Sequence, residues 1–401
     1  MNAKTLVKTP LGRAALAKKT KSQKLNGKVI VQILPALNHG GVERGSVEMA
    51  QAIIDAGGRA MVISSGGMLE SQLKRIGAEH ITLDVHSKNP LKWPMVRRKL
   101  RMVLQDLKPD LVHMRSRAPA WIAFPVCKAL RLKTITTVHG RFKAGNLFKK
   151  FYNSIMVRSD VVIAISDYVA GLIWSQFPEA KDKTVTIHRG VDIHLFDPKA
   201  VASQRVIKAS ETLVLPDGLP VVMLPGRPTK WKGWSVLVEA MGKLKDRDFM
   251  LVLVGAGDGD QDFQQKLMAD IDNAGIASKC RISKSMTDMP AALMLADVVV
   301  MPSVTPEPFG RVAIEASAMG CPVVAFNHGG AAESIIDGET GWLAEPVEVD
   351  ALAEAIKQGL SMTKKNRKIM ASHARKFIQD GFSSEKMCQS TIGVYVNLLN
   401  S

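Results

Sequence analysis

The sequence has 401 residues, of which 46% are hydrophobic and 5% aromatic, and its formal net charge is +17. This length and composition are ordinary for a globular protein of two or three domains and exclude a disordered chain, while no apolar run reaches the roughly 18 residues of a membrane span. The four cysteines are far apart and form no C-x-x-C pair, which favours a reducing, cytoplasmic compartment over a zinc or redox centre.

The first half of the chain alternates strand-like and helical runs. Residues 1–28 contain no acid and several lysines, so we expect a flexible basic tail. Seven strand-like runs follow between Val29 and Ile187, and they predict a doubly wound α/β domain with a parallel sheet over residues 29–205. Gly40-Gly41 follows the first run and opens a helix, where backbone N–H groups can approach an anion. His139 stands at another strand end, where a cleft is expected.

This half also carries the excess positive charge. Residues 1–200 have 33 lysines and arginines against 14 acidic residues, whereas the remainder has 21 against 23. Such asymmetry predicts an anionic partner, and the candidates are nucleic acid, an acidic lipid surface and a phosphorylated glycan. No aromatic residues are interleaved with the basic ones to stack on bases, so we expect no nucleic acid and favour a membrane-facing or phosphate-facing surface.

Residues 206–380 repeat the alternating pattern and predict a second such domain, and a helix over residues 381–401 is expected to pack back on the first. The strand-like run from Val221 leads into a Gly/Pro loop with Arg227 and Lys232, a pair suited to holding a diphosphate without a metal. The triplet that begins at Asp258 leaves a metal–diphosphate site as an alternative, but we expect no metal.

The most specific stretch is a strand, loop, helix and strand between Met301 and Ala325. Glu307 lies in its loop, and Glu315 lies eight positions further on, about two turns into the helix that Pro308-Phe309-Gly310 opens. Ligands of parallel sheets bind beyond the carboxyl ends of the strands, so both carboxylates are expected at one cleft.

Taken together, these motifs resemble those of retaining glycosyltransferases of family 4, which have the two-domain GT-B fold. Six elements occur in the family's order: the Gly40-Gly41 loop, VHG at His139, RGVD at 189–192, the GR…KG loop from Gly226 to Gly233, the E-x7-E unit, and a GG…E…DG…G tail. The resemblance implies two Rossmann-like domains that face each other across a cleft. Residues 113–121 and 188–192 are most similar to bacterial lipopolysaccharide-core and surface-glycan transferases.

The resemblance implies transfer of a hexose from a UDP- or GDP-sugar with retention of configuration, without metal or cofactor. Four residues are implied in catalysis: His139, Glu307, Arg227 and Lys232. Those implied to bind the donor are Gly40, Gly41, Arg227, Lys232, Glu307, Phe309, Gly310 and Glu315. Within this set, Arg227 and Lys232 match the diphosphate-binding pair, Glu307 the acid near the donor sugar, and Glu315 the acid that accepts from the ribose hydroxyls.

Three arginines are expected on the acceptor side: Arg115, Arg117 and Arg189. The last of these stands where the family has an asparagine, and residues 281–285 lack the glycine that usually lies beside the nucleobase, which leaves the base open. The expected acceptor is a lipid-linked or phosphorylated glycan, and the expected location is peripheral, on the inner face of the cytoplasmic membrane. Two alternatives remain. A sugar-nucleotide epimerase of the same fold would not need the basic half, and a non-catalytic basic protein that binds membranes or polyanions would not need the paired acids.

Overall fold

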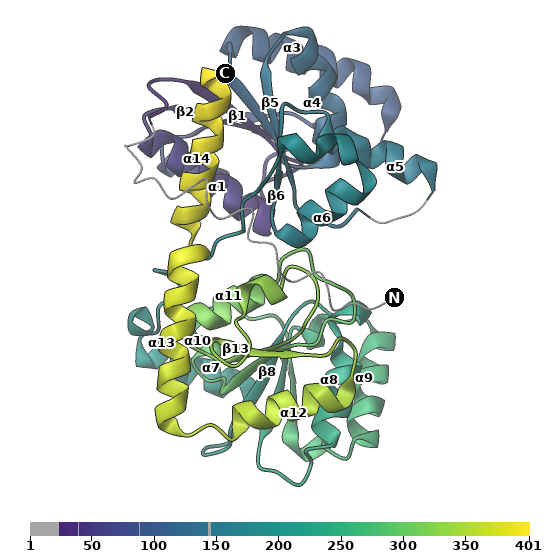
Figure 1. Cartoon of the computed structure of the whole chain (residues 1–401), viewed down its shortest axis with the longest axis vertical. Coiled ribbons are helices and arrows are strands. Elements are labelled where there is room, and N and C mark those ends of the chain that lie inside the picture. The colour runs from purple at the N-terminus through teal and green to yellow at the C-terminus, as the bar shows by residue number, and fades with distance from the viewer. Residues whose placement is uncertain (1–23, 39, 88, 143–145) are drawn as a thin grey trace.

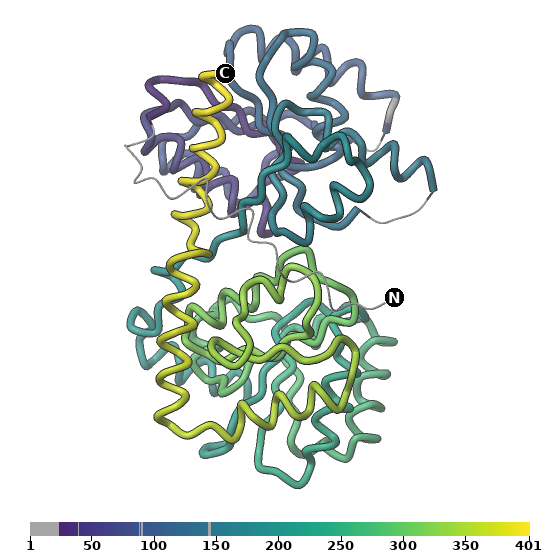
Figure 2. Tube along the Cα trace, viewed as in Figure 1, coloured from purple at the N-terminus to yellow at the C-terminus, as the bar shows by residue number. Residues whose placement is uncertain are grey.

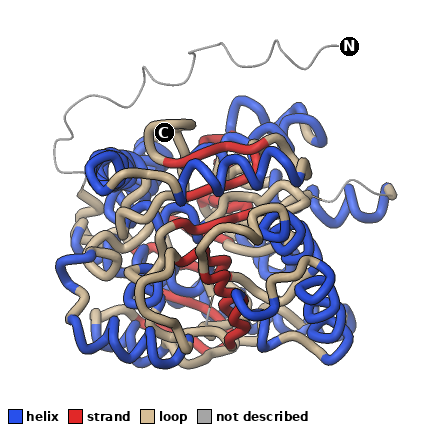
Figure 3. Tube along the Cα trace, turned by 90° about the horizontal axis from the view of Figure 1, so that it is seen from below, coloured by secondary structure: helices blue, strands red, loops and turns tan. Residues whose placement is uncertain are grey.

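The structure is a computed structural model that describes residues 24–38, 40–87, 89–142 and 146–401. It consists of two parallel sheets, each with helices on both faces (Figures 1 and 3). The strand orders are β3-β2-β1-β4-β5-β6-β7 and β10-β9-β8-β11-β12-β13, and every pair of neighbours is parallel. The predicted α/β fold with two Rossmann-like domains is therefore confirmed.

The first sheet is formed by short runs of mostly β-branched and aliphatic residues, which suit strands buried on both faces. Its strands are β1 (Val29–Ile33), β2 (Arg59–Ser64), β3 (Glu79–Thr82), β4 (Leu111–Met114), β5 (Lys133–Val138), β6 (Val161–Ala164) and β7 (Thr184–Thr186). Its helices are α1 (Gly41–Asp55), α2 (Glu70–Arg75), α3 (Trp93–Leu107), α4 (Arg117–Ala129), α5 (Leu147–Ser154) and α6 (Asp167–Gln176).

The second sheet is built in the same way. Its strands are β8 (Val221–Pro225), β9 (Met250–Val254), β10 (Cys280–Ser283), β11 (Val298–Met301), β12 (Val323–Phe326) and β13 (Gly341–Ala344). The helices of this half are α7 (Ser203–Leu213), α8 (Trp234–Gly242), α9 (Gln261–Asn273), α10 (Met289–Leu293), α11 (Arg311–Ala318) and α12 (Val349–Leu360).

The last two helices join the domains. In Figures 1 and 2, α13 (Lys364–Gly381) runs along the second domain, and α14 (Ser384–Asn400) continues onto the first, where it lies beside α1. The hydroxyl of Tyr395 on α14 lies 2.6 Å from Nδ1 of His113 on β4, and both side chains are fully buried. This buried contact secures the C-terminal helix to the first sheet.

Folded structure begins before the expected boundary at residue 29. Leu25 is 1% exposed, and its backbone N–H donates to the carbonyl oxygen of Ala56. Burial of this leucine orders residues 24–28, so the expectation of a flexible tail is wrong for these residues. Residues 1–23 lie outside the described residues. Among the residues that the structure describes, no helix is both long and apolar enough to cross a bilayer.

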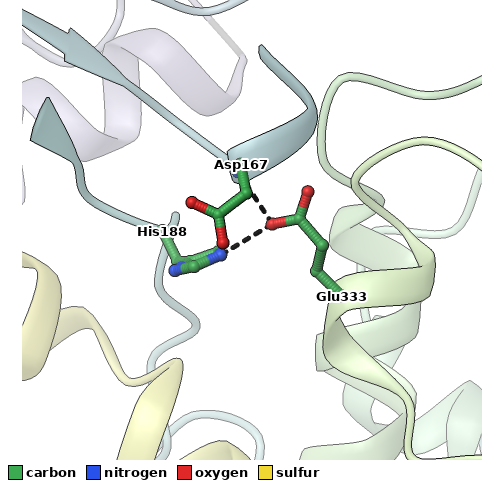
Figure 4. Close-up of side chains that lie close together, drawn as sticks. All are labelled: Asp167, His188 and Glu333. Carbon is green, nitrogen blue, oxygen red and sulfur yellow. Dashed lines mark hydrogen bonds and ion pairs between the residues drawn. The ribbon is translucent and has the colours of Figure 1, made fainter. Parts of the chain in front are cut away.

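A second junction between the domains is a carboxylate that caps a helix of the other domain (Figure 4). Glu333 of the second domain accepts hydrogen bonds from the backbone N–H groups of Asp167 and Tyr168, at 2.9 and 2.7 Å, in the first turn of α6. Its Oε2 also lies 2.7 Å from Nε2 of His188. We call this arrangement the Glu333 clasp.

The clasp includes a potential metal-ligand group, because Asp167, His188 and Glu333 each offer one atom within 4.8 Å of the others. Both oxygens of Glu333 already accept hydrogen bonds, and the positive end of α6 faces them. A cation would have to displace these donors and oppose the helix dipole, so we interpret the group as an interdomain clasp.

Candidate active site

Most of the predicted site residues lie just beyond the carboxyl ends of strands, in loops or in the first turn of the helix that follows. Gly40 and Gly41 follow β1, Arg115 follows β4, His139 follows β5, Lys232 follows β8, and Glu307 follows β11. In parallel sheets this edge is where ligands bind.

Two loops of the second domain are clamped together around Lys232 and Glu307. Gly233 has φ +78°, and a Cβ there would lie 1.8 Å from the carbonyl oxygen of Pro302, so only glycine allows this approach. The backbone N–H of Val304 donates to the carbonyl of Trp231 at 2.9 Å. As a result, Nζ of Lys232 lies 2.7 Å from Oε1 of Glu307, and the two side chains are 12% and 9% exposed.

Residues of the GG…E tail support Glu307 from behind. The backbone N–H of Gly330 donates to the carbonyl oxygen of Glu307 at 2.8 Å, and Ser303 donates its hydroxyl to the Glu307 carboxylate. The His328 ring contacts the carbonyl of Ser303 at 2.7 Å. Sequence reasoning assigned no role to Ser303 or His328, because no local pattern shows that Ser303 contacts Glu307 or that His328 contacts Ser303.

Glu315 forms an ion pair within its own helix. α11 begins after Gly310, which has φ +94°, and Nη2 of Arg311 lies 2.6 Å from Oε1 of Glu315 one turn later. Burial raises the pKa of Glu315, while the charges of Arg311, Arg44 and Lys232 act to lower it. The carboxylate therefore lies among three cations in a water-poor cleft.

A pocket of about 440 Å³ lies between the domains at this point. Its lining comes from both halves of the chain and comprises Gly40, Arg44, Leu69, Leu195, Phe196, Arg205, Met286, Thr287, Asp288, Met289, Pro290, Arg311 and Glu315. Sequence reasoning missed Arg44 and Arg311. A signal existed, since each is a cation in the first turn of a helix that opens after glycine at a strand end.

The start of α1 lies against the start of α11 at Gly41. A Cβ on Gly41 would lie 3.0 Å from Nη1 of Arg311 and 3.4 Å from Nη2 of Arg189. A larger residue would push these guanidinium groups away from the cleft.

A second pocket, of about 230 Å³, lies within the first domain and brings three predicted residues together. Arg115, Arg117 and His139 all line it. Arg115 is buried and donates to the side-chain oxygen of Gln32, whereas Nη1 of Arg117 donates to Oδ1 of Asn153 at 3.0 Å.

His139 is held by Arg189, the residue that replaces the family's asparagine. Nη1 of Arg189 lies 3.2 Å from Nδ1 of His139, and Nη2 donates to the carbonyl of Gly41. Burial lowers the pKa of His139 well below its ordinary value, and the charges of Arg189 and Arg115 lower it further, so the ring is neutral. Arginine has no acceptor, so Nδ1 must accept, which places the proton on Nε2. Among the described residues, buried Nε2 has no partner, which leaves it available to a ligand.

Two predicted donor-binding side chains make no hydrogen bond or ion pair with these groups among the described residues. Arg227 is exposed, and its guanidinium makes no hydrogen bond or ion pair with any described residue. Phe309 is 3% exposed and packs against His188 and Phe382 at the domain junction, with ring centroids 6.2 and 6.1 Å away. The structure thus brings Lys232, Glu307, Glu315 and Gly41 to one cleft, whereas the side chains of Arg227 and Phe309 form no hydrogen bond or ion pair with these described residues.

Two facing Rossmann-like domains with ligand-binding loops at their adjoining edges define the GT-B class of glycosyltransferases. Comparison with known families agrees: residues 39–195 match Glycosyltransferase Family 4, and residues 207–377 match Glycosyl transferases group 1. A crystal structure of a glycosyltransferase from Rickettsia africae is 35% identical, with a TM-score of 0.86, over 93% of this chain and 99% of that one. The chain therefore belongs to the glycosyltransferases that combine a Glycosyltransferase Family 4 domain with a Glycosyl transferases group 1 domain.

Two further relatives extend the comparison. The GDP-mannose-dependent alpha-(1-6)-phosphatidylinositol monomannoside mannosyltransferase of Mycolicibacterium smegmatis is 28% identical over 283 residues, which are 66% of this chain and 71% of that protein. The crystal structure of Anabaena HepE in complex with UDP-glucose shares the fold, with 23% identity and a TM-score of 0.76 over 92% of this chain and 99% of its own. The epimerase and the non-catalytic binding protein are not favoured.

Proposed function

We propose that this glycosyltransferase moves a hexose from a UDP- or GDP-sugar to a lipid-linked or lipopolysaccharide-core type glycan. Transfer retains the anomeric configuration, needs no metal or cofactor, and takes place at the inner face of the cytoplasmic membrane. The observation that carries the proposal is the Lys232–Glu307 pair, nearly buried at the carboxyl edge of the second sheet. A cation and a carboxylate held at one point suit a substrate with a diphosphate beside a sugar.

In this reaction the bond between the anomeric carbon and the diphosphate oxygen breaks, and the acceptor oxygen forms a bond to the same carbon from the same face. The acceptor proton passes to the leaving diphosphate. Lys232 and Arg227 stabilise the growing negative charge, while N–H groups at the start of α1 add fixed dipoles. Glu307 binds the donor sugar, and Nε2–H of His139 donates a hydrogen bond to it.

The ion pairs of the cleft have a simple role in donor binding. Glu315 accepts hydrogen bonds from the ribose hydroxyls in place of Arg311, and Arg311 is then free to contact the phosphates. Lys232 likewise exchanges part of its contact with Glu307 for the diphosphate. Because charged partners are replaced by charged or hydroxyl groups of the substrate, no buried charge is left unpaired.

Relatives and charge support the choice of substrates. The Anabaena structure contains UDP-glucose, and the name of the Mycolicibacterium enzyme specifies GDP-mannose and a phosphatidylinositol glycolipid. The first 200 positions contain 33 basic and 14 acidic residues, and this excess of positive charge fits an anionic acceptor and an anionic membrane. The two arginines in the first-domain pocket, Arg115 and Arg117, are proposed to face that acceptor together with Arg189.

The test is nucleotide release by the purified protein with EDTA present, across a panel of UDP-, GDP- and ADP-sugars, alongside Glu307→Ala. We expect one donor to release nucleotide and the variant to lose the activity. The proton coupling at the anomeric carbon of a transferred sugar then reports retention. Failure of every nucleotide sugar in the panel to bind saturably would contradict the proposal, and activity that EDTA abolishes would contradict its metal independence.

A further inference from the structure

The helix α5 exposes its apolar side chains and buries a polar one. Leu147, Phe148 and Phe151 are 84%, 82% and 60% exposed, whereas Asn153 is 3% exposed. On a helix at 100° per residue the three apolar side chains share one face, and Asn153 lies opposite them. A helix on a water-facing surface does the reverse, so this face is arranged to be covered by an apolar phase.

Among the residues that the structure describes, none covers Leu147 or Phe148, which are 84% and 82% exposed. In Figures 1 and 3, α5 projects from the side of the first domain, away from the second domain and from α14. The helix packs on its neighbours along one edge: Nε1 of Trp121 on α4 donates to the carbonyl of Tyr152 at 3.0 Å, and the Trp121 and Phe151 rings lie 5.1 Å apart, so Phe151 stands at the edge of the apolar face. Leu147 and Phe148 extend beyond this contact.

The charge around α5 identifies what covers it. Lys149 and Lys150 follow Phe148 directly in the chain and are exposed, and α5 contains no acid. Between His86 and Arg158 the sequence has 17 lysines and arginines but only two aspartates. Apolar side chains bordered by lysines match the boundary between acyl chains and anionic headgroups. A protein partner of ordinary composition offers no such uniform negative charge.

The inner side of α5 leads directly to the first-domain pocket. Asn153, the one buried residue of the helix, accepts the 3.0 Å hydrogen bond from Arg117, which lines that pocket with Met156. If α5 lies at a membrane surface, its contact with Arg117 therefore fixes the distance between Arg117 and that surface.

We propose that α5 is an interfacial helix that inserts Leu147, Phe148 and Phe151 into the headgroup boundary of an anionic bilayer and presents the first-domain pocket to that surface. The inference deepens the proposed function, from which it takes the lipid-linked acceptor. Vesicle binding needs no turnover, so it can be tested separately from transfer.

Two kinds of variant test it. All four native cysteines are buried, so Phe148→Cys carries a single environment-sensitive fluorophore, and Met268→Cys on α9 is the matched control, since Met268 is also exposed. We expect a blue shift at position 148 with vesicles of phosphatidylcholine and phosphatidylglycerol at low salt. The label at position 268 should not respond to them, and pure phosphatidylcholine should give a weak response at position 148.

Sedimentation with the same vesicles measures the energetic contribution. We expect Leu147→Ser/Phe148→Ser to bind roughly tenfold or more weakly, and Lys149→Glu/Lys150→Glu to lose the preference for anionic lipid. The matched controls are Met268→Ser/Ile369→Ser and Lys364→Glu/Lys365→Glu, a second exposed lysine pair at the start of a helix, and both should bind as the unmodified chain does. Nucleotide release without vesicles should be unchanged in every variant.

The proposal is overturned if the serine variant sediments with vesicles as the unmodified chain does, or if the label at position 148 stays in water on bound protein. Concentration-dependent dimerisation that the serine variant abolishes, without vesicle binding by the unmodified chain, would assign the face to a second copy and also overturn it. If the unmodified chain released nucleotide from no donor but still bound vesicles through α5, the proposed function alone would be refuted.

Discussion

At the residue scale, the contact between Arg189 and His139 determines what the histidine can do. A neutral ring with its proton on Nε2 donates a hydrogen bond to a substrate and does not act as a base at neutral pH. Burial lowers the pKa of Arg189 to about 10, so its guanidinium is still charged and still a donor. His139 is thereby fixed as a donor by a residue 50 positions away.

This assignment predicts a spectroscopic signature. With nitrogen-15 in the histidine rings, His139 should show the Nε2–H tautomer and should not titrate between about pH 5.5 and 8. Arg189→Met should allow the other tautomer and lower nucleotide release about tenfold, which is the effect of one lost hydrogen bond. Arg189→Lys keeps a donor, so it should retain most of the Nε2–H tautomer and most of the nucleotide release. A wild-type His139 that carries its proton on Nδ1, or titrates in this range, would refute the assignment.

At the element scale, the Glu333 clasp makes the first turn of α6 depend on the other domain. Ser166 and Glu333 together accept from N–H groups that the helix itself leaves unpaired. Ser166 also donates to the carbonyl of Pro308, in the loop that holds Glu307, at 2.6 Å. The start of α6 therefore links the domain junction to the candidate site.

Weakening the clasp should loosen α6 specifically. We expect Glu333→Gln to cost about 1–2 kcal/mol of unfolding free energy, because a charged acceptor of two backbone N–H groups becomes neutral. Hydrogen exchange should quicken at Asp167 and Tyr168. Glu339→Gln, at an exposed acid six residues further on, is the control. Equal exchange in both variants would show that the clasp does not hold the helix.

These elements also show how far the sequence predicts the site. Strand ends and glycine turns are local patterns, so the sequence predicts that the loops with Gly41, Lys232 and Glu307 lie at the edges of two sheets, and the structure has them there. The partners within the site are set by packing between distant segments: Glu333 and Tyr168 are 165 positions apart, and no periodicity encodes their contact. Phe309 illustrates the same limit, because its motif predicts a donor contact while its side chain packs into the domain junction.

At the scale of the whole molecule, two buried neutral histidines make folding sensitive to acid. Burial lowers the pKa of His113 and His139 well below 6.5, where histidines of the unfolded chain titrate. The unfolded state thus binds protons that the folded state does not. Stability is complete above about pH 6.5 and falls as the pH drops below it, by about 1.4 kcal/mol per pH unit for each histidine.

His113 matters most in this respect, because its bond to Tyr395 joins the C-terminal helix to the first sheet. His113→Asn should be less stable at pH 7.5, yet its urea midpoint should fall less steeply on acidification. His373→Asn, at an exposed histidine on α13, should keep the steep dependence of the unmodified chain. A slope unchanged by His113→Asn would show that this histidine is not buried in its neutral form.

The proposed reaction requires both domains to act on one substrate, and Lys232 provides the most direct test of it. Lys230 and Lys232 lie on the same short turn, but only Lys232 pairs with Glu307, and Lys230 is exposed. We would measure nucleotide release from the preferred donor by Lys232→Met and Lys230→Met. We expect a roughly 100- to 1000-fold loss for Lys232→Met, by analogy with losing one donor to a developing anion, and near-normal release for Lys230→Met. Equal release by both variants and the unmodified chain would contradict it.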